Sequence, residues 1–381
     1  MAPEPLGAYP ALTGLRGLAA AWVMIFHAWG ASEPRLMPVP LFGTDIDFTW
    51  FFASGWVGVD IFFTLSAFLL ALPFAYAAAT QTAQPRLADY LRRRCLRILP
   101  AYYLQLALVL GATFLLEGRL ALAPRELGAH LLLWLNIGPE PVTPLVAVTW
   151  TLPIEFGFYL LLPLLVPLLT PRRAFLLLAG AIVSTFAYRY GMFLTIADSS
   201  VAEKVRLLEQ LPGRLDQFAL GAVTAVWVAN RTDLGRALGL VQTRALTVFG
   251  LGLFAVMFVL MYYNQMQYFD GHPLLFSFHL GISVAIAALI LALCSDQNRD
   301  LRVLASRPMV FLGTISYSFY LWHQVIQQWL MKQPWLDHWS PYPLPALLLV
   351  GGSLTIVVAW LSWRFVEAPA LALGRSGFRS V

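Results

Sequence analysis

The amino-acid sequence predicts an all-α fold, a polytopic transmembrane helical bundle. Of its 381 residues, 59% are hydrophobic and only 12% are charged, whereas soluble domains have about 25% charged residues. The apolar residues fall in runs of about 20 between short charged loops, and a run of that length crosses about 30 Å of hydrocarbon. Runs such as AFLLLAGAIVSTFAY at 174–188 do not alternate apolar and polar residues, as barrel strands would. The composition therefore excludes a soluble globular enzyme.

Ten apolar runs are expected to cross the membrane. They lie near residues 11–30, 56–79, 98–116, 145–169, 174–196, 212–230, 244–263, 274–294, 309–331 and 344–366. The apolar piece at 126–137 has about 12 residues, too few to cross, so we expect a re-entrant or interfacial helix there. No linker separates a second folded unit, so residues 1–381 are expected to form one membrane domain. No signal peptide is recognisable, so the first span is expected to be retained.

The basic residues orient these spans, because cytoplasmic loops collect Lys and Arg. With ten crossings and the N-terminus inside, 17 of the 25 Lys and Arg lie on the inner side, 7 on the outer side, and Arg189 within a span. This predicts both termini in the cytoplasm of a bacterial-type inner membrane. The net charge of +5 is not concentrated in a tail, so no nucleic-acid partner is expected. Cys95 and Cys294 lie beside arginine-rich segments and have no metal-ligand neighbours, so neither a disulfide nor a metal is expected.

The first span carries two ionisable residues, Arg16 and His27. Ionisable groups inside spans are costly and usually face a protein interior or a water path. Eleven residues are about three helical turns, so the two side chains share one face, about 16 Å apart along the axis. A neutral imidazole at such a site can take a proton from an acceptor hydroxyl as a general base. Taken alone, however, an intramembrane histidine is more often a packing residue.

Two carboxylates within the spans are candidates to assist His27. Asp60 in the second span and Glu155 in the fourth are expected in the outer half of the membrane or near its midplane. Either could orient the imidazole or stabilise its charged form, as the third member of a catalytic triad does, and the sequence does not choose between them. The structural alternatives are that Asp60 caps a helix end and that Glu155 satisfies a helix broken at Pro153.

Further polar residues predict an outer chamber for the acceptor substrate. Arg214 and Asp216 begin the sixth span, and Tyr317 and His323 lie on the ninth. Trp150 is a candidate to stack on a sugar ring. The alternative is structural: Arg214 and Asp216 as a local pair, and His323 as a packing residue.

The segment RRRCLRILPAYY at 92–103 lies at the cytoplasmic entrance to the third span. Arg94 and Arg97 are separated by one helical turn, a spacing that suits an anionic phosphate ligand. Coenzyme A thioesters fit this arrangement, because their phosphates need cationic contacts while the pantetheine arm extends over a distance such as that between Arg16 and His27. The alternative is that these arginines only anchor the topology.

Several segments in order resemble the acyltransferase 3 family of membrane acyltransferases. They are TGLRGLAAAWVMIFHA with Arg16 and His27, GVDIFFTLSAFLL with Asp60, the Arg94/Arg97 pair followed by Tyr102, TWTLPIEFGFYLLLPLL with Glu155, RLDQFALGA, SYSFYLWHQ and RFVEAPA. The resemblance covers nearly the whole chain.

The resemblance implies transfer of an acetyl or other short acyl group from acyl-CoA, the donor substrate, to a hydroxyl of a cell-surface or lipid-linked saccharide. His27 then matches the family's essential histidine, and Arg16, Arg94 and Arg97 match its functional arginines, with Tyr102 as a further donor contact. Glu155 stands alone where relatives often have two adjacent acidic residues, because Phe156 follows it. No C-terminal SGNH domain is expected, so transfer would occur within the membrane domain or with a separate extracytoplasmic partner. Two alternatives are acylation of a small glycosylated metabolite and, in a different class, a secondary transporter.

Overall fold

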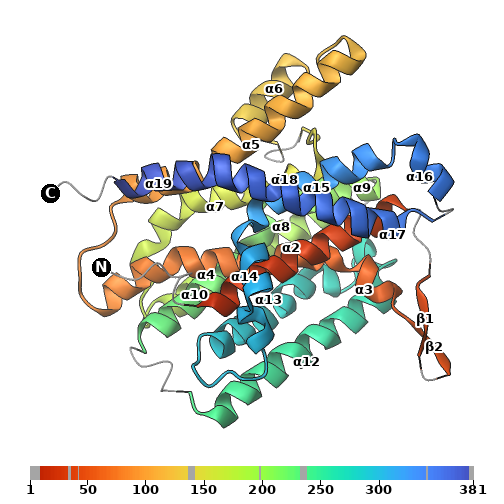
Figure 1. The fold of residues 1–381 in the computed structure, drawn as a ribbon. Coiled ribbons are helices and arrows are strands. Elements are labelled where there is room, and N and C mark those ends of the chain that lie inside the picture. Colours follow the sequence, from red (N-terminus) through yellow and green to blue (C-terminus); the bar gives the residue numbers. More distant parts are fainter. Residues whose placement is uncertain are drawn as a thin grey trace.

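The computed structural model describes residues 9–32, 36–41, 43–135, 142–196, 199–231, 238–339 and 342–376. This part of the chain is a bundle of helices with one small β-hairpin (Figure 1). The all-α fold predicted from the sequence is confirmed.

The longer helices are α2 (Pro10–Ala31), α4 (Gly58–Ala79), α5 (Leu87–Glu117), α7 (Thr151–Leu165), α8 (Ala174–Thr195), α10 (Leu215–Ala229), α12 (Leu240–Asn264), α13 (Leu274–Leu293), α15 (Ser316–Leu330) and α18 (Gly352–Ser362). The shorter helices are α3 (Thr49–Ala53), α6 (Pro124–Leu131), α9 (Val201–Leu208), α14 (Arg307–Thr314), α16 (Pro334–Trp339), α17 (Leu344–Ala346) and α19 (Ala368–Ser376).

Single-turn elements join or extend these helices. The 3-10 turns are η1 (Gly55–Val57), η2 (Ala147–Trp150), η3 (Val166–Leu168), η4 (Leu211–Arg214), η5 (Tyr268–Asp270) and η6 (Arg302–Ala305). Two π-helical stretches, η7 (Leu347–Gly351) and η8 (Trp363–Glu367), link α17, α18 and α19. The strands β1 (Pro38–Leu41) and β2 (Thr44–Asp47) pair antiparallel beside α3.

Helix α2 lies at the centre of the packing that forms the site. It contacts α4, α14, α15 and η1, and α10 packs along the opposite side of α4. The crossing of α2 and α14 depends on Gly313, because a Cβ atom there would overlap the main-chain carbonyl of Thr13. Small residues at such crossings allow helix backbones to approach closely. The result is a tight contact that fixes α2 against its neighbours.

Eight helices in the described residues are long and apolar enough to cross a membrane. They are Pro10–Ala31, Gly55–Ala79, Leu87–Glu117, Ala147–Leu168, Ala174–Thr195, Leu240–Asn264, Leu274–Leu293 and Leu344–Gly374. Each coincides with one of the ten expected spans. The expected span 212–230 corresponds to η4 followed by α10. The expected span 309–331 corresponds to α14 and α15, which are separated at Ile315. That these two segments cross the membrane stays a prediction.

The apolar piece at 126–137 contains most of α6 (Pro124–Leu131), and its residues 136 and 137 lie outside the described part. Helix α6 has 8 residues, so at 1.5 Å per residue it is about 12 Å long, too short to cross a bilayer. Figure 1 shows α6 beside the end of α5, where both project from the rest of the bundle.

Candidate active site

His27 lies in the last turns of α2 and faces His323 of α15. The Nδ1 atom of His27 is 3.0 Å from the Val23 carbonyl oxygen and 3.1 Å from Nε2 of His323. His323 is fully buried, whereas His27 is only partly buried. The Nε2 atom of His27 has no hydrogen-bond partner within the described part of the chain. This ring nitrogen is therefore the one available to a substrate.

The η2 turn (Ala147–Trp150), which precedes α7, packs against α15 near the histidine pair. The Val148 amide donates to Gln324 Oε1 at 3.0 Å, and the Tyr320 hydroxyl donates to the Val148 carbonyl at 2.9 Å. The Tyr320 ring contacts the His323 ring, with 5.7 Å between centroids. Trp150, the candidate for sugar stacking, is half-buried in the same η2 turn.

Three arginines gather at the other end of the same face of α2. Arg16 has Arg97 and Glu155 among its electrostatic neighbours, and Arg94 is an electrostatic neighbour of Tyr159. No hydrogen bond or ion pair joins the Arg16 guanidinium to a residue that the structure describes. The Nε atom of Arg94 is buried and likewise has no described partner. This end of α2 therefore carries cationic groups that are not neutralised by direct contacts.

Arg97 differs from the other two arginines because it forms an ion pair. Its Nη1 atom donates to Glu367 Oε2 at 2.9 Å, and the Glu367 side chain is only 1% exposed. The Arg97 guanidinium also lies 5.8 Å from the centre of the Tyr317 ring. The hydroxyl of Tyr317 donates to the Ile98 carbonyl at 2.8 Å, and Ser318 donates to the second oxygen of Glu367. Arg97 and Tyr317 thus join α5, α15 and η8.

Glu155 belongs to the arginine end of the site. Its Oε1 atom accepts hydrogen bonds from Ser66 at 2.8 Å and from Tyr159 at 2.6 Å. Neither bond involves His27. The structure thus brings Glu155 near Arg16, with Tyr159 as a neighbour that it shares with Arg94, and it places a histidine, not a carboxylate, beside His27.

Asp60 also has partners other than His27. Its Oδ1 atom accepts from Arg214 Nη1 at 2.9 Å and lies 2.6 Å from His279 Nδ1, and Gln217 donates to the same oxygen. Two residues earlier, Gly58 packs against α2, and a step of two residues rotates a helical side chain by about 200°. Asp60 therefore faces α10 and α13, on the side of α4 away from α2.

Glu209 extends this ionic cluster from the loop between α9 and η4. It forms an ion pair with Arg214, whose side chain is 3% exposed. Burial opposes ionisation of the Glu209 carboxyl, yet the positive charge of Arg214 holds its pKa below the usual value. The cluster ties α4, α10, α13 and η4 together through charges.

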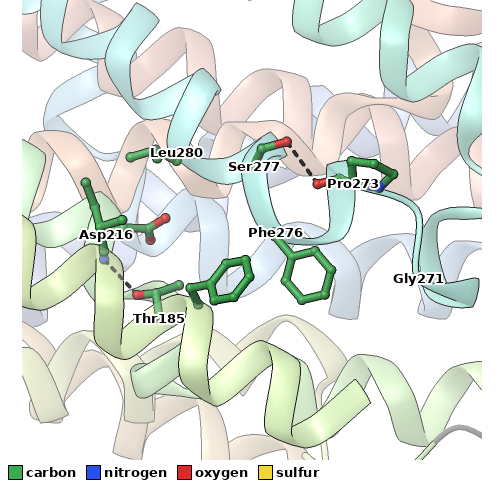
Figure 2. Close-up of a pocket in the computed structure, with 9 residues that line it drawn as sticks. Thr185, Asp216, Gly271, Pro273, Phe276, Ser277 and Leu280 are labelled. Atoms are coloured by element: carbon green, nitrogen blue, oxygen red, sulfur yellow. Dashed lines mark hydrogen bonds between the residues drawn. The ribbon is translucent and has the colours of Figure 1, made fainter. Parts of the chain in front are cut away.

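Asp216 lies apart from Asp60, at a cavity between α8, α10 and α13 (Figure 2). The cavity has a volume of about 460 Å³ and mostly apolar walls, including Phe186, Phe276 and Leu280. The main-chain amide of Asp216 donates to Thr185 Oγ1 at 3.2 Å. Asp216 is the predicted site residue that lines this cavity, and the histidine pair does not reach it.

Tyr102 links α5 to α6. Its hydroxyl donates to the His130 carbonyl at 3.1 Å, and its side chain is 1% exposed. No role is expected from the sequence for His279 or Glu367, which the structure places in ion-pair clusters with Asp60 and Arg97, respectively. The signal for Glu367 was its position in the closing RFVEAPA segment, whereas His279 stands in an apolar run without a motif.

Comparisons with known proteins agree on one family. The sequence profile of the acyltransferase 3 family, described as an acyltransferase domain, matches residues 9–364. The chain is 23% identical to O-acetyltransferase OatA of Staphylococcus aureus over 97% of its own length and 58% of that protein. It is 26% identical to the putative peptidoglycan O-acetyltransferase YrhL of Bacillus subtilis over 97% of its own length and 56% of that protein.

A shorter relative, putative acetyltransferase ORF330 of Acidianus two-tailed virus, is 26% identical over 84% of this chain and 83% of its own. The chain therefore spans somewhat more than half the length of OatA and YrhL and most of the length of the viral protein. No solved structure matches it. Because the family profile covers nearly the whole chain, the protein belongs to the acyltransferase 3 family of membrane acyltransferases.

Proposed function

We propose that the protein is a membrane O-acyltransferase that moves an acetyl or other short acyl group from acyl-CoA to a hydroxyl of a cell-surface or lipid-linked saccharide. The printed names of OatA and YrhL describe O-acetyltransferases, and that of YrhL names peptidoglycan. The observation that carries the proposal is the placement of His27 and Arg16 on one face of α2. One end of this face carries the imidazole of His27, and the other end carries the guanidinium group of Arg16, with that of Arg94 close by.

Arg16 and Arg94 are the proposed ligands of the donor phosphates. Both guanidinium groups lack a described ion-pair partner, and cations of this kind bind phosphate oxygens through charge-assisted hydrogen bonds. Arg16 and His27 are separated by about 16 Å along α2, a span that an extended pantetheine arm covers. The thioester carbonyl would then reach Nε2 of His27 while the phosphates stay near the arginines.

The proposed reaction has one proton to move. The acceptor oxygen attacks the thioester carbonyl carbon, a C–O bond forms, and Nε2 of His27 takes the hydroxyl proton. The C–S bond then breaks, and the imidazolium returns the proton to the leaving thiolate. The products are the O-acyl saccharide and free coenzyme A, and His27 is neutral again.

The orientation of the protein follows from the charge of its loops. The inner segments carry most of the Lys and Arg, so we propose a bacterial-type inner membrane with both termini in the cytoplasm. The arginine end of α2 then faces the cytoplasmic acyl-CoA, and the His27 end faces the acceptor. This arrangement lets the acyl group cross about half of the hydrocarbon thickness while bound to the donor.

The test uses the purified full chain in detergent with [14C]acetyl-CoA and a soluble peptidoglycan disaccharide. We expect wild-type protein to transfer or hydrolyse the acetyl group and His27→Ala to do neither. We expect Arg16→Gln and Arg94→Gln to raise KM for acetyl-CoA, with exposed Arg92→Gln as the matched control. Wild-type protein that neither hydrolyses nor transfers acetyl would rule out the proposal.

A further inference from the structure

We infer that His323 is a positioning residue that fixes the tautomer of His27 so that Nε2 is the basic nitrogen. This inference rests on the proposed function, since it concerns how the base is held. Three contacts carry it: His27 with Val23, His27 with His323, and His323 with Phe319. From the sequence alone, His323 is expected near the acceptor, and a carboxylate, Asp60 or Glu155, is expected to orient His27.

The tautomers follow from the donor and acceptor character of each partner. A carbonyl oxygen only accepts, so the Val23 carbonyl, 3.0 Å from Nδ1 of His27, requires a proton on that nitrogen. The Phe319 carbonyl, 3.3 Å from Nδ1 of His323, requires a proton there as well. A neutral His323 then has a lone pair on Nε2, which lies 3.1 Å from the protonated Nδ1 of His27. The single Nδ1 proton of His27 is then shared between the Val23 carbonyl and the His323 lone pair, and in the neutral imidazole Nε2 of His27 carries no proton.

His323 itself is held rigidly. It is 0% exposed, and its ring stacks on Phe319 with 6.5 Å between centroids and 17° between planes. One helical turn further along α15, the Gln327 amide donates to the Met24 carbonyl of α2 at 3.0 Å. A second hydrogen bond, which does not involve the histidine pair, therefore holds α15 against α2.

No described carboxylate competes for this role. The carboxylates on the helices around the pair are Asp60 of α4 and Glu155 of α7, and the titratable side chain in contact with His323 is Tyr320 of α15. The Tyr320 hydroxyl is bonded to the Val148 carbonyl, Asp60 to Arg214, and Glu155 to Ser66 and Tyr159. The base is thus oriented by a second imidazole.

His323 would act when His27 accepts a proton. The imidazolium form of His27 donates more strongly from Nδ1, and the lone pair of His323 accepts that bond. A neutral partner stabilises the cation less than a carboxylate would, so the proton is more readily returned to the leaving thiolate. Partners that orient a metal-binding imidazole typically contribute about 10–100-fold, and we expect an effect of the same order for His323.

The experiment compares three variants of the full chain in the acetyl-CoA assay. His323→Leu removes the acceptor, His323→Gln offers an amide oxygen in its place, and Gln327→Met breaks the neighbouring contact between the same two helices. We expect His323→Leu to lower kcat about 10–100-fold with KM for acetyl-CoA unchanged, and to move the acid limb of the pH–rate profile to lower pH. We expect His323→Gln to recover most of kcat and Gln327→Met to match the wild type.

The outcomes separate this inference from the proposed function. An inactive wild type overturns the proposed function itself. If the wild type is active and His27→Ala is inactive, the proposed function stands. A His323→Leu variant that then has the kcat and pH profile of the wild type overturns only the role of His323. If His323→Leu does not fold, a His323→Gln variant that folds with the thermal stability of the wild type but has the kcat of His27→Ala also overturns it.

Discussion

The buried ion pair between Arg97 and Glu367 is expected to hold the C-terminal helices on α5. Glu367 lies in η8, and its two carboxylate oxygens bind Arg97 and Ser318. The perturbation is a pair of charge-removing substitutions, Glu367→Gln and Arg97→Gln, made singly and together. Glutamine has nearly the size of glutamate, and it is shorter than arginine but keeps an amide that can donate a hydrogen bond, so both changes act chiefly on the charges.

The size of the effect follows from the 2.9 Å separation and the burial of the pair. At that distance, the Coulomb attraction is about 6 kcal/mol for an effective dielectric constant of about 20. Desolvation of both groups offsets part of it, while loss of one partner leaves a buried charge without its counter-ion, which typically costs about 3–5 kcal/mol. Glu367 is 1% exposed and Arg97 17%, so Arg97→Gln, which strands the more deeply buried charge, should cost more than Glu367→Gln.

The assay is a double-mutant cycle on the free energy of unfolding, from SDS titration in mixed micelles. The buried thiol of Cys294 reports unfolding through a thiol-reactive dye. We expect the double variant to be no less stable than the worse single variant, which gives a coupling energy above about 1.5 kcal/mol. Additive costs, with coupling below about 0.5 kcal/mol, would refute the reasoning. The double variant should also keep the wild-type KM for acetyl-CoA, whereas Arg97 as a donor ligand would raise it.

Three further predictions concern the packing and the second ionic cluster. Asp60→Asn should lower the free energy of unfolding by about 3 kcal/mol, since it removes a partner from buried Arg214, and an SDS titration that shows no change would contradict this. Gly313→Ala should lower the free energy of unfolding by about 1–3 kcal/mol or more, because the added Cβ overlaps the main chain of α2. The control Gly111→Ala, whose added Cβ meets open space, should leave that free energy undiminished. Glu209 has a lowered folded-state pKa, so it stabilises the protein above its usual pKa of 4.5 and loses that contribution as pH falls. Glu209→Gln should therefore lose less thermal stability than the wild type between pH 6 and pH 3, a range that extends below the usual pKa of 4.5; equal losses would contradict the pairing.

The sequence predicted the helices well because their signal is local. Runs of about 20 apolar residues and a shared face for Arg16 and His27 depend only on neighbours along the chain. Eight of the ten expected spans are long apolar helices in the structure. The ninth expected span is broken at Ile315, which a hydropathy window averages over.

The partners of the charged residues could not be predicted, because they depend on how distant helices pack. Asp60 binds Arg214, which is 154 positions away, and Arg97 binds Glu367 across 270 positions. His27 and His323 are separated by 296 positions. Their pairing depends on the rotation of α15 against α2, and no pattern within either segment encodes that rotation.

The partners of Glu155 show what counting along a span leaves open. Counting from the start of the apolar run places Glu155 in the outer half of the membrane or near its midplane, which stays a prediction, but the count does not say which residues lie beside it. Val148 is already buried, at 1% exposure, and bonds to Gln324 beside the histidine pair. Seven residues later, about 10 Å further along the helix axis, Glu155 is an electrostatic neighbour of Arg16. The carboxylate therefore serves the arginine end of α2, and the histidine end is left to a second histidine.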